Sequence, residues 1–217
     1  MKNALLFTII FAFAYTVQSQ VTFNTVELYT KNSLEIINRA ATIESDSSGE
    51  KYLRLSEVQT EGMAWYPTTP FSEGTIELEM RGKDVFQRSF IGIVFNGQND
   101  STYEAVYCRP FNFFAKDSVR RVHAIQYISH PEYTWSKLRT ERNAEFESEI
   151  VNPPNPNSWF ALKLVITEKS VSAFINGATN PALKVTRLSA YSSGKIGIFA
   201  ASFSGGDFRN LKVTPKK

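Results

Sequence analysis

Short runs in which apolar and polar residues alternate one by one are the feature that most constrains this fold. Successive side chains of a β-strand point to opposite faces, so such a run has one buried face and one solvated face. Residues 74–82, 158–168 and 170–177 all follow this pattern. We predict three strands, the last two joined as a hairpin at Glu168-Lys169. Their inward residues are Ile76, Leu78, Met80, Phe160, Leu162, Leu164, Ile166, Val171, Ala173 and Ile175.

Strand-like segments continue along most of the chain, with turn residues between them and no convincing amphipathic helix. The turn Ser204-Gly205-Gly206 separates the last two segments. This pattern predicts an all-β protein, a two-sheet antiparallel jelly-roll sandwich, and the absence of a blade-length repeat argues against a propeller. The further segments are 34–43, 51–56, 62–66, 88–96, 102–108, 122–128, 144–151, 182–187, 194–202 and 206–214.

The first 19 residues are typical of a secretory signal peptide. Lys2 precedes a nearly unbroken apolar run from Ala4 to Tyr15, which is too short to span a bilayer, and Ser19 is a small residue at the expected cut. We therefore expect a signal peptide over 1–19 and one domain over 20–217. We also expect a secreted or periplasmic location and no membrane span.

The net charge and the cysteine count limit which partners and which covalent cross-links we expect. Without Lys2 the chain keeps 23 of its 24 basic residues against 21 acidic ones, interspersed along the sequence. No basic stripe is present, so nucleic acid is not an expected partner. Cys108 is the only cysteine, so no internal disulfide can form, and we interpret it as a small buried hydrophobic residue.

The segments YEAVYCRPFNF, NSWFALKLVI and GKIGIFAASFSGGDFRNLKV carry a resemblance that runs from Glu73 to Asn210. This stretch resembles the concanavalin A-like lectin/glucanase jelly roll. In order and spacing it is similar to the laminin-G-like and 3-keto-disaccharide-hydrolase-like domains of secreted bacterial proteins. The resemblance implies the fold, but this fold carries lectins, glycosidases and adhesion modules alike.

A ligand site is expected around the run from Tyr103 to Arg139, where arginines, aromatics and amides alternate. An aromatic ring can cover the apolar face of a sugar, and planar guanidinium or amide groups can bond adjacent hydroxyls. A partly exposed Arg109 should contribute more to binding than to folding. The candidate ligand-binding residues are Tyr107, Arg109, Asn112, Gln126, Tyr127, Trp135 and Arg139.

A structural alternative stays open for the same segment. Phe111, Phe113, Phe114 and Trp135 could seal the edge of the sandwich, and the arginines could pair with Glu104, Asp117 or Glu132. For Phe113 and Phe114 we prefer this interpretation.

Catalytic residues are harder to identify. Glu77 and Glu79 share a strand face, but Arg81 stands where the laminarinase-type pattern of this superfamily has a further acid, so we expect cross-strand ion pairs there. Glu104, His123 and Glu132 are the candidates for a general acid or base near the aromatic site. For His123, expected within a strand, and for His130, expected in a loop, a structural role is the favoured interpretation.

No cofactor and no metal site are expected from residue spacing. Structural calcium is frequent in the superfamily that the chain resembles. Asn96, Asn99, Asp100 and Asp207 could supply oxygens, although no defined metal-loop spacing is present.

Three functions are compatible with these features, and we rank them in the following order. The first is a lectin-like domain that binds an oligosaccharide as its partner. The second is a hydrolase acting on a glycosidic or 3-keto-glycoside substrate. The third is a protein–protein adhesion module.

The first prediction concerns processing. Secreted material should begin at Gln20, because Ser19 supplies the small residue before the cut. N-terminal sequencing or intact mass measures this, and a retained apolar segment would contradict the expected localisation.

Overall fold

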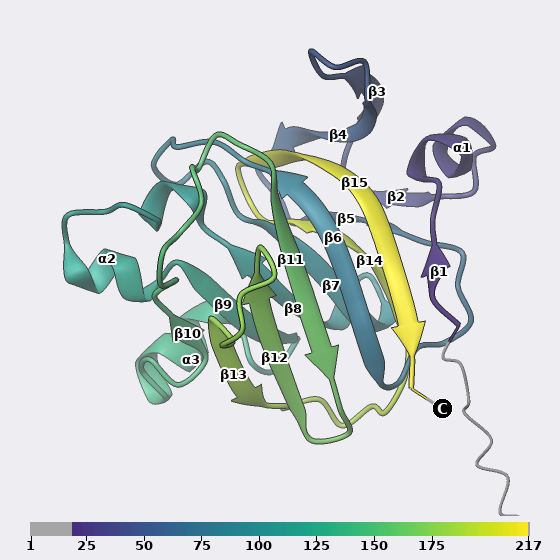
Figure 1. The fold of residues 1–217 in the computed structure, drawn as a ribbon. Helices are drawn as coiled ribbons and strands as arrows, with labels where there is room; N and C mark the ends of the chain where they lie inside the picture. Colours follow the sequence, from purple (N-terminus) through teal and green to yellow (C-terminus); the bar gives the residue numbers. More distant parts are fainter. Residues whose placement is uncertain (1–18, 217) are drawn as a thin grey trace, which may run out of the picture.

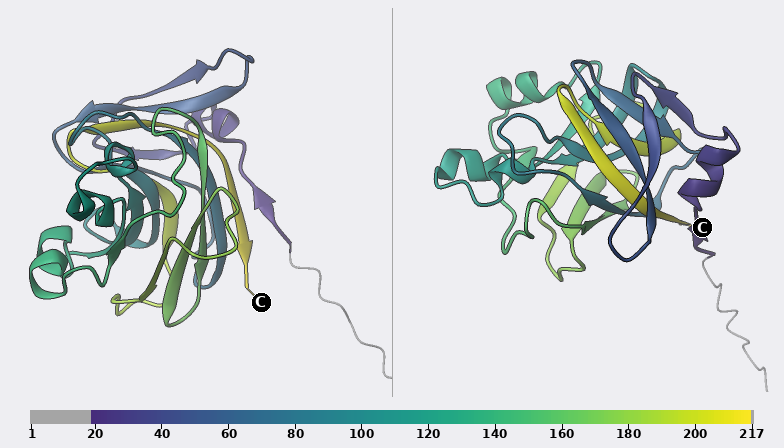
Figure 2. Two further views of the ribbon diagram at one scale, coloured as in Figure 1. Left: turned by 60° about the vertical axis from the view of Figure 1, so that its left-hand side comes forward. Right: turned by 90° about the horizontal axis from the view of Figure 1, so that it is seen from above.

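Two antiparallel sheets stacked face to face form the protein, as predicted (Figures 1 and 2). The computed structural model describes residues 19–216, so the predicted signal peptide lies almost wholly outside the described residues. Within the described range, no helix is long and apolar enough to cross a membrane.

An 8-stranded sheet forms one layer. Its order is β13 (Leu183–Thr186), β12 (Ser170–Ile175), β11 (Phe160–Ile166), β6 (Gly74–Arg81), β15 (Ser204–Pro215), β4 (Lys51–Val58) and β3 (Ala41–Ser45), and β1 (Val21–Thr22) pairs with β15. Leu164 lies opposite Ile76 of β6 and Ala173 of β12. All three side chains are fully buried, which confirms the inward face predicted from the alternation.

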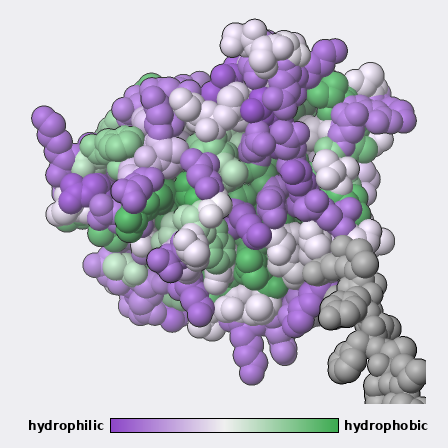
Figure 3. Space-filling view, viewed as in Figure 1, coloured by the Kyte–Doolittle hydropathy of each residue, from purple (hydrophilic) through white to green (hydrophobic). Residues whose placement is uncertain are grey.

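The outer face of the 8-stranded sheet is polar. Lys163 lies 3.5 Å from Glu77, and Arg209 donates to Glu79 at 2.7 Å, which confirms the predicted cross-strand ion pairs. Figure 3 looks onto this face and shows hydrophilic side chains spread between smaller hydrophobic areas.

A 7-stranded sheet forms the other layer. Its order is β10 (Glu147–Ser148), β9 (Ile125–His130), β8 (Thr102–Cys108), β7 (Ile91–Asn99), β14 (Lys195–Ala200), β5 (Gly62–Trp65) and β2 (Glu35–Ile37). Val106 lies opposite Ile93 and Tyr127, and this face turns toward the other sheet. Cys108 shares the inner face and is fully buried, as predicted for a small hydrophobic residue.

Gly92 shapes the outer face of the 7-stranded sheet. It lies opposite Tyr107, and a Cβ at this position would lie 2.8 Å from the Tyr107 Cβ and 2.1 Å from the Val106 carbonyl oxygen. Only glycine allows so close an approach, and the Tyr107 ring can therefore pack with Phe90 and Phe199 on this face.

Three short helices interrupt the strands: α1 (Thr25–Thr30), α2 (Ser118–Val122) and α3 (Trp135–Glu141). Helices α2 and α3 lie at the β9–β10 edge of the 7-stranded sheet (Figures 1 and 2). A 3₁₀ turn, Pro110–Asn112, follows β8.

On this side of the molecule, two of the predicted strands cover different residues in the structure. Residues 122–128 do not form one strand, because the Asp117 side chain caps α2 by accepting from the Val119 amide at 2.9 Å. His123 follows this helix as its C-cap, and His130 ends β9. Of residues 144–151, only the two residues of β10 pair.

Two other boundaries also differ from the prediction. Residues 34–43 form two strands in different sheets, because Asn38 takes a positive φ of 53° and turns the chain. Ser204-Gly205-Gly206 is the start of β15, not a turn. The turn lies just before it, where Phe203 has a φ of 59°.

The second prediction concerns the core. Leu164→Ala should lower the free energy of unfolding by roughly 2–5 kcal/mol, because it removes a fully buried side chain between the sheets. Val165→Ala, on the outer face of the same strand, is the control and should cost about 1 kcal/mol or less. Urea denaturation measures both, and equal losses would mean that the faces are wrongly assigned.

Candidate ligand-binding cavity

A cavity of about 430 Å³ opens on the outer face of the 7-stranded sheet, where β8 ends. Four segments surround it: the stretch before β7, the stretch after β8 with α2, helix α3, and the turn before β15. Glu61, from the turn before β5, completes the lining. Its walls combine aromatic rings with guanidinium groups. The aromatic residues are Phe86, Phe90, Tyr107, Phe111, Trp135 and Phe203, and the arginines are Arg109, Arg120 and Arg139.

Arg109 lies at the base of this cavity. Pro110, which has no N–H to donate, begins the 3₁₀ turn and ends the strand. The Arg109 guanidinium donates from Nη1 to the His123 carbonyl oxygen at 2.9 Å and from Nη2 to the Tyr107 hydroxyl at 3.0 Å. Nη2 also donates to Oε1 of Gln126. Only 5% of its side chain is exposed, so the expectation of a partly exposed Arg109 was wrong.

Glu147 supplies the countercharge from β10. Its carboxylate accepts from Arg139 Nε at 3.1 Å and from Nη2 at 2.7 Å, and it lies 3.7 Å from Arg109 Nη1. His123 Nδ1 lies 2.8 Å from the same carboxylate, in contact but without the alignment of a regular hydrogen bond. With 2% of its side chain exposed, Glu147 is a buried anion shared by two arginines and a histidine.

Burial governs the titration of the groups around Glu147. It lowers the pKa of His123 below its ordinary value of 6.5, and the nearby Glu147 carboxylate only partly opposes this shift. Burial also lowers the pKa of Arg109 and raises the pKa of Tyr107. A guanidinium stays charged in proteins, so Arg109 is a buried cation and His123 is neutral near pH 7.

Trp135 and Arg139 form one wall from α3. The Thr134 side chain caps this helix by accepting from the Lys137 amide at 3.3 Å. Residues four apart are neighbours on a helix surface, and the Arg139 guanidinium lies 5.2 Å from the centre of the Trp135 ring. Arg139 thus links the buried carboxylate to an indole ring that is 46% exposed.

Arg120 and Asn112 form the opposite wall. Arg120 donates from Nε to the Asn112 side-chain oxygen at 3.2 Å and from Nη2 to the Phe111 carbonyl oxygen at 3.1 Å. Its guanidinium lies 4.6 Å from the centre of the Phe86 ring. These contacts join α2 to the 3₁₀ turn.

The structure brings together most of the predicted ligand-binding residues. Gln126 is fully buried beneath Arg109, and its side-chain oxygen accepts hydrogen bonds from Arg109 and Tyr107. Its side-chain nitrogen has no hydrogen-bond partner among the described residues. The residues that line the cavity itself are Tyr107, Arg109, Asn112, Trp135 and Arg139.

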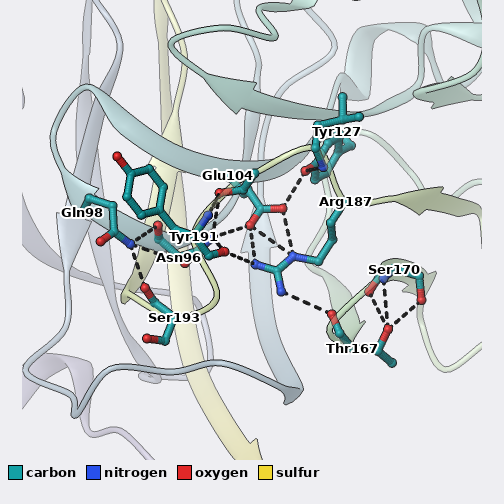
Figure 4. A network of polar contacts seen from close by, with 11 residues as sticks. Asn96, Gln98, Glu104, Tyr127, Thr167, Ser170, Arg187, Tyr191 and Ser193 are labelled. Atoms are coloured by element: carbon teal, nitrogen blue, oxygen red, sulfur yellow. Dashed lines mark hydrogen bonds and ion pairs between the residues drawn. The ribbon is translucent and has the colours of Figure 1, made fainter.

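Tyr127 lies elsewhere, on the inner face of the sheet, because consecutive strand residues point to opposite faces. Its hydroxyl donates to Glu104 at 2.6 Å. Arg187 also binds Glu104, with Nη2 at 2.5 Å, and Asn96 completes the group (Figure 4). This inner network ties the segment after β13 to the 7-stranded sheet.

The three catalytic candidates separate in the structure. Glu104 is fully buried on the inner face, so it does not reach the cavity. Glu132 pairs with Lys137 on the exposed surface. His123 alone lines the cavity.

Glu61 lines the cavity and was missed in the sequence. It accepts a hydrogen bond from the Tyr103 hydroxyl at 2.6 Å, and His130, stacked on Tyr103, lies 3.7 Å away through Nδ1. Glu61 precedes β5 at a turn, far along the chain from the run that carried the prediction. Phe86, Phe90 and Phe203 were missed for the same reason. Arg120 was also missed, although it lies within the run from Tyr103 to Arg139.

Of the aromatic residues that we expected to seal the edge of the sandwich, some lie in the core and others on the surface. Phe113 is buried against Phe160, as the structural interpretation expected. Phe114 is 63% exposed, so the same interpretation was wrong for that residue.

The oxygens considered for calcium contact other groups. Asp207 binds Arg54 and Arg81, and Asp100 accepts from the Trp65 indole at 2.9 Å. Within residues 19–216, no group of three or more His, Cys, Asp and Glu side chains is arranged to hold a metal.

No protein-family model and no curated protein sequence matches the chain. Solved structures do. The carbohydrate binding module CBM66 from Bacillus subtilis superposes with a TM-score of 0.57 at 14% identity, covering 84% of this chain and 96% of that one. The exoplasmic/lumenal domain of VIP36, bound to Ca²⁺ and Man3GlcNAc, gives 0.54 at 11% identity, covering 87% and 86%.

A protein from Parabacteroides distasonis described as a candidate glycosyl hydrolase gives a TM-score of 0.53 at 12% identity, covering 86% of this chain and 89% of that one. At such identities the likeness shows the fold, a lectin-like β-sandwich. This agrees with the sandwich that the sequence resemblance implied.

The third prediction concerns Glu147. Glu147→Gln keeps the side-chain shape but leaves the buried Arg109 and the partly exposed Arg139 without their carboxylate. Breaking such a pair should cost roughly 3–5 kcal/mol of unfolding free energy. Glu145→Gln is the control, since Glu145 pairs with Arg142 on the exposed surface and should cost about 1 kcal/mol or less. Equal losses in urea denaturation would show that Glu147 does not organise the cavity.

Proposed function

We propose that this protein binds an oligosaccharide in the cavity, through hydrogen bonds from guanidinium and amide groups and through stacking on aromatic rings. The observation that carries the proposal is the pairing of Trp135, half exposed at the wall, with Arg139, held in place by the buried Glu147. A ring and a planar donor side by side match the two faces of a sugar, one apolar and one edged with hydroxyls.

Exposed aromatic rings around the cavity support this proposal. Phe86 is 58% exposed and Phe203 is 42% exposed, and both line the cavity together with Trp135. Large apolar side chains gathered on a surface mark binding sites more often than chance placement. Their rings offer several stacking surfaces, which suits an oligosaccharide better than a single sugar.

The polar groups have different roles in this proposal. Arg109 is almost fully buried and orients Tyr107 and Gln126, so it is a positioning residue. Arg139 keeps 31% of its side chain exposed and can contact a ligand while bound to Glu147. Because these donors are already fixed, little conformational entropy is lost on binding.

The structural neighbours are consistent with the proposal. One is described as a carbohydrate binding module, and another was solved with Man3GlcNAc bound. We propose further that the chain is exported through its first 19 residues, which would place the cavity where extracellular glycans occur.

A glycan-processing hydrolase is the second candidate, and Glu61 is the observation that favours it. This carboxylate lines the cavity beside Tyr103 and His130 and could act as a general acid or base. Most glycosidases need two working carboxylates. Glu61 is the one carboxylate among residues 19–216 that lines the cavity, and Glu147 is held by arginines, so we rank binding first.

The fourth prediction tests the binding site. On a panel of oligosaccharides measured by calorimetry, Trp135→Ala should weaken binding about tenfold or more, which corresponds to about 1.4 kcal/mol, because the main stacking surface is lost. Phe114→Ala removes an exposed aromatic residue that does not line the cavity and is the control, with unchanged affinity expected.

The same panel separates the two candidate functions. Product analysis after long incubation should detect intact oligosaccharide with the wild-type protein. Turnover that disappears in Glu61→Gln would favour the hydrolase. If no oligosaccharide binds, the carbohydrate proposal fails and an adhesion role takes its place.

A further inference from the structure

We propose that the ligand of this cavity is an acidic sugar, whose carboxylate is bound by Arg120. This inference rests on the proposed function and specifies its substrate class as uronic-acid-containing oligosaccharides. It is carried by the charges in and beneath the cavity and by the partners that each charge has.

Positive charge exceeds negative charge at the cavity. The guanidinium groups of Arg109, Arg120 and Arg139 line it, and the opposing carboxylates are Glu61 in the wall and Glu147 beneath it. His123 adds no charge near neutral pH, because burial lowers its pKa. Glu147 is already bound by Arg109 and Arg139, so the remaining cation is Arg120.

Arg120 has only neutral partners in the described part of the chain. It donates to the Asn112 amide oxygen and to the Phe111 carbonyl oxygen, and it lies over the Phe86 ring. These contacts fix the plane of the guanidinium without neutralising it. A planar guanidinium held in this way has the geometry to bind a carboxylate through two parallel hydrogen bonds.

Several other basic residues near the cavity are neutralised. Arg121, the next residue of α2, lies 3.2 Å from Glu149, and Arg142 lies 2.7 Å from Glu145. Lys137 pairs with Glu132. Arg88, whose guanidinium lies 5.2 Å from the centre of the Phe203 ring, also has no ion pair among the described residues, but it does not line the cavity. Arg120 is therefore the lining arginine that has no carboxylate within the described chain.

A neutral sugar would cover Arg120 without supplying a countercharge. Removing a cation from water without a partner is costly, whereas a carboxylate at this place would form a charge-assisted hydrogen bond in a partly enclosed cavity. Trp135 and Arg139 line the same cavity and are available to the rest of the sugar.

The test uses trisaccharides of galacturonic, mannuronic and glucuronic acid, each beside its methyl ester. The ester keeps the ring and the hydroxyl groups and removes the charge. Calorimetry should show at least one acid binding about tenfold or more tightly than its ester, as expected for hydrogen bonds to a charged group. This preference should shrink as salt is raised, since the cavity is open to solvent.

Arg120→Gln should abolish the preference for the acid, so that the acid and its ester bind with equal affinity. Arg121→Gln is the matched control on the same helix and should keep the preference. Arg120→Lys retains the charge and should keep part of it. Unchanged melting temperatures establish that the variants are folded.

The outcomes distinguish the inference from the function on which it rests. If acid and ester bind with equal affinity and Trp135→Ala still weakens binding, the acidic ligand is overturned. The proposed carbohydrate site is then retained. An acid preference that survives Arg120→Gln overturns the role of Arg120. If neither the acids, their esters nor neutral oligosaccharides bind, both proposals fail.

Discussion

The buried carboxylate of Glu147 is the interaction on which the cavity depends. Arg109 and Arg139 reach it from different segments, and the buried Arg109 would have no countercharge without it. Strand β10 contributes only two residues to the sheet, so its backbone pairing is short and the charge contacts of Glu147 add to it. One anion thus fixes the end of β8, the start of β9 and helix α3 in relation to one another.

Strand β8 carries a second buried ion pair on its other face. Glu104 binds Arg187 between the sheets, while Arg109 binds Glu147 on the outer face. The inner pair also engages Tyr127 and Asn96, which satisfies the polar groups that the core would otherwise leave unpaired (Figure 4). The two networks have different consequences. The inner one holds the two sheets together, and the outer one shapes an open cavity in which Arg120 is the lining arginine without a carboxylate partner among the described residues.

Much of the fold followed from the sequence because alternation is a local property. Leu164 and Ile76 could be assigned to the core from their neighbours alone, and the structure buries both. The segment 122–128 could not be assigned in this way, because the Asp117 cap acts within a short helix that leaves no periodic pattern. Residues 34–43 read as one strand because nothing local marks the change of sheet at Asn38.

The residues of the cavity could be predicted only in part from the sequence, for a related reason. Arg109, Trp135 and Arg139 stand in one conspicuous run, and the structure gathers them. Gln126 and Tyr127 were grouped by composition, although adjacent strand residues must face opposite ways, and the structure separates them. Glu61 and Glu147 went unrecognised, because a lone glutamate becomes notable only when distant strands bring it to an arginine or a tyrosine.

The most direct measurement follows the indole N–H signals of the three tryptophans by NMR during titration with the tightest-binding oligosaccharide of the panel. Trp135 lines the cavity, Trp65 is buried in the 7-stranded sheet, and Trp159 lies against Arg81 and Arg209 of the other sheet. A ligand in the cavity should shift the Trp135 signal and leave that of Trp159 in place. A shift of Trp159 with Trp135 unmoved would place the ligand on the opposite sheet and contradict the account.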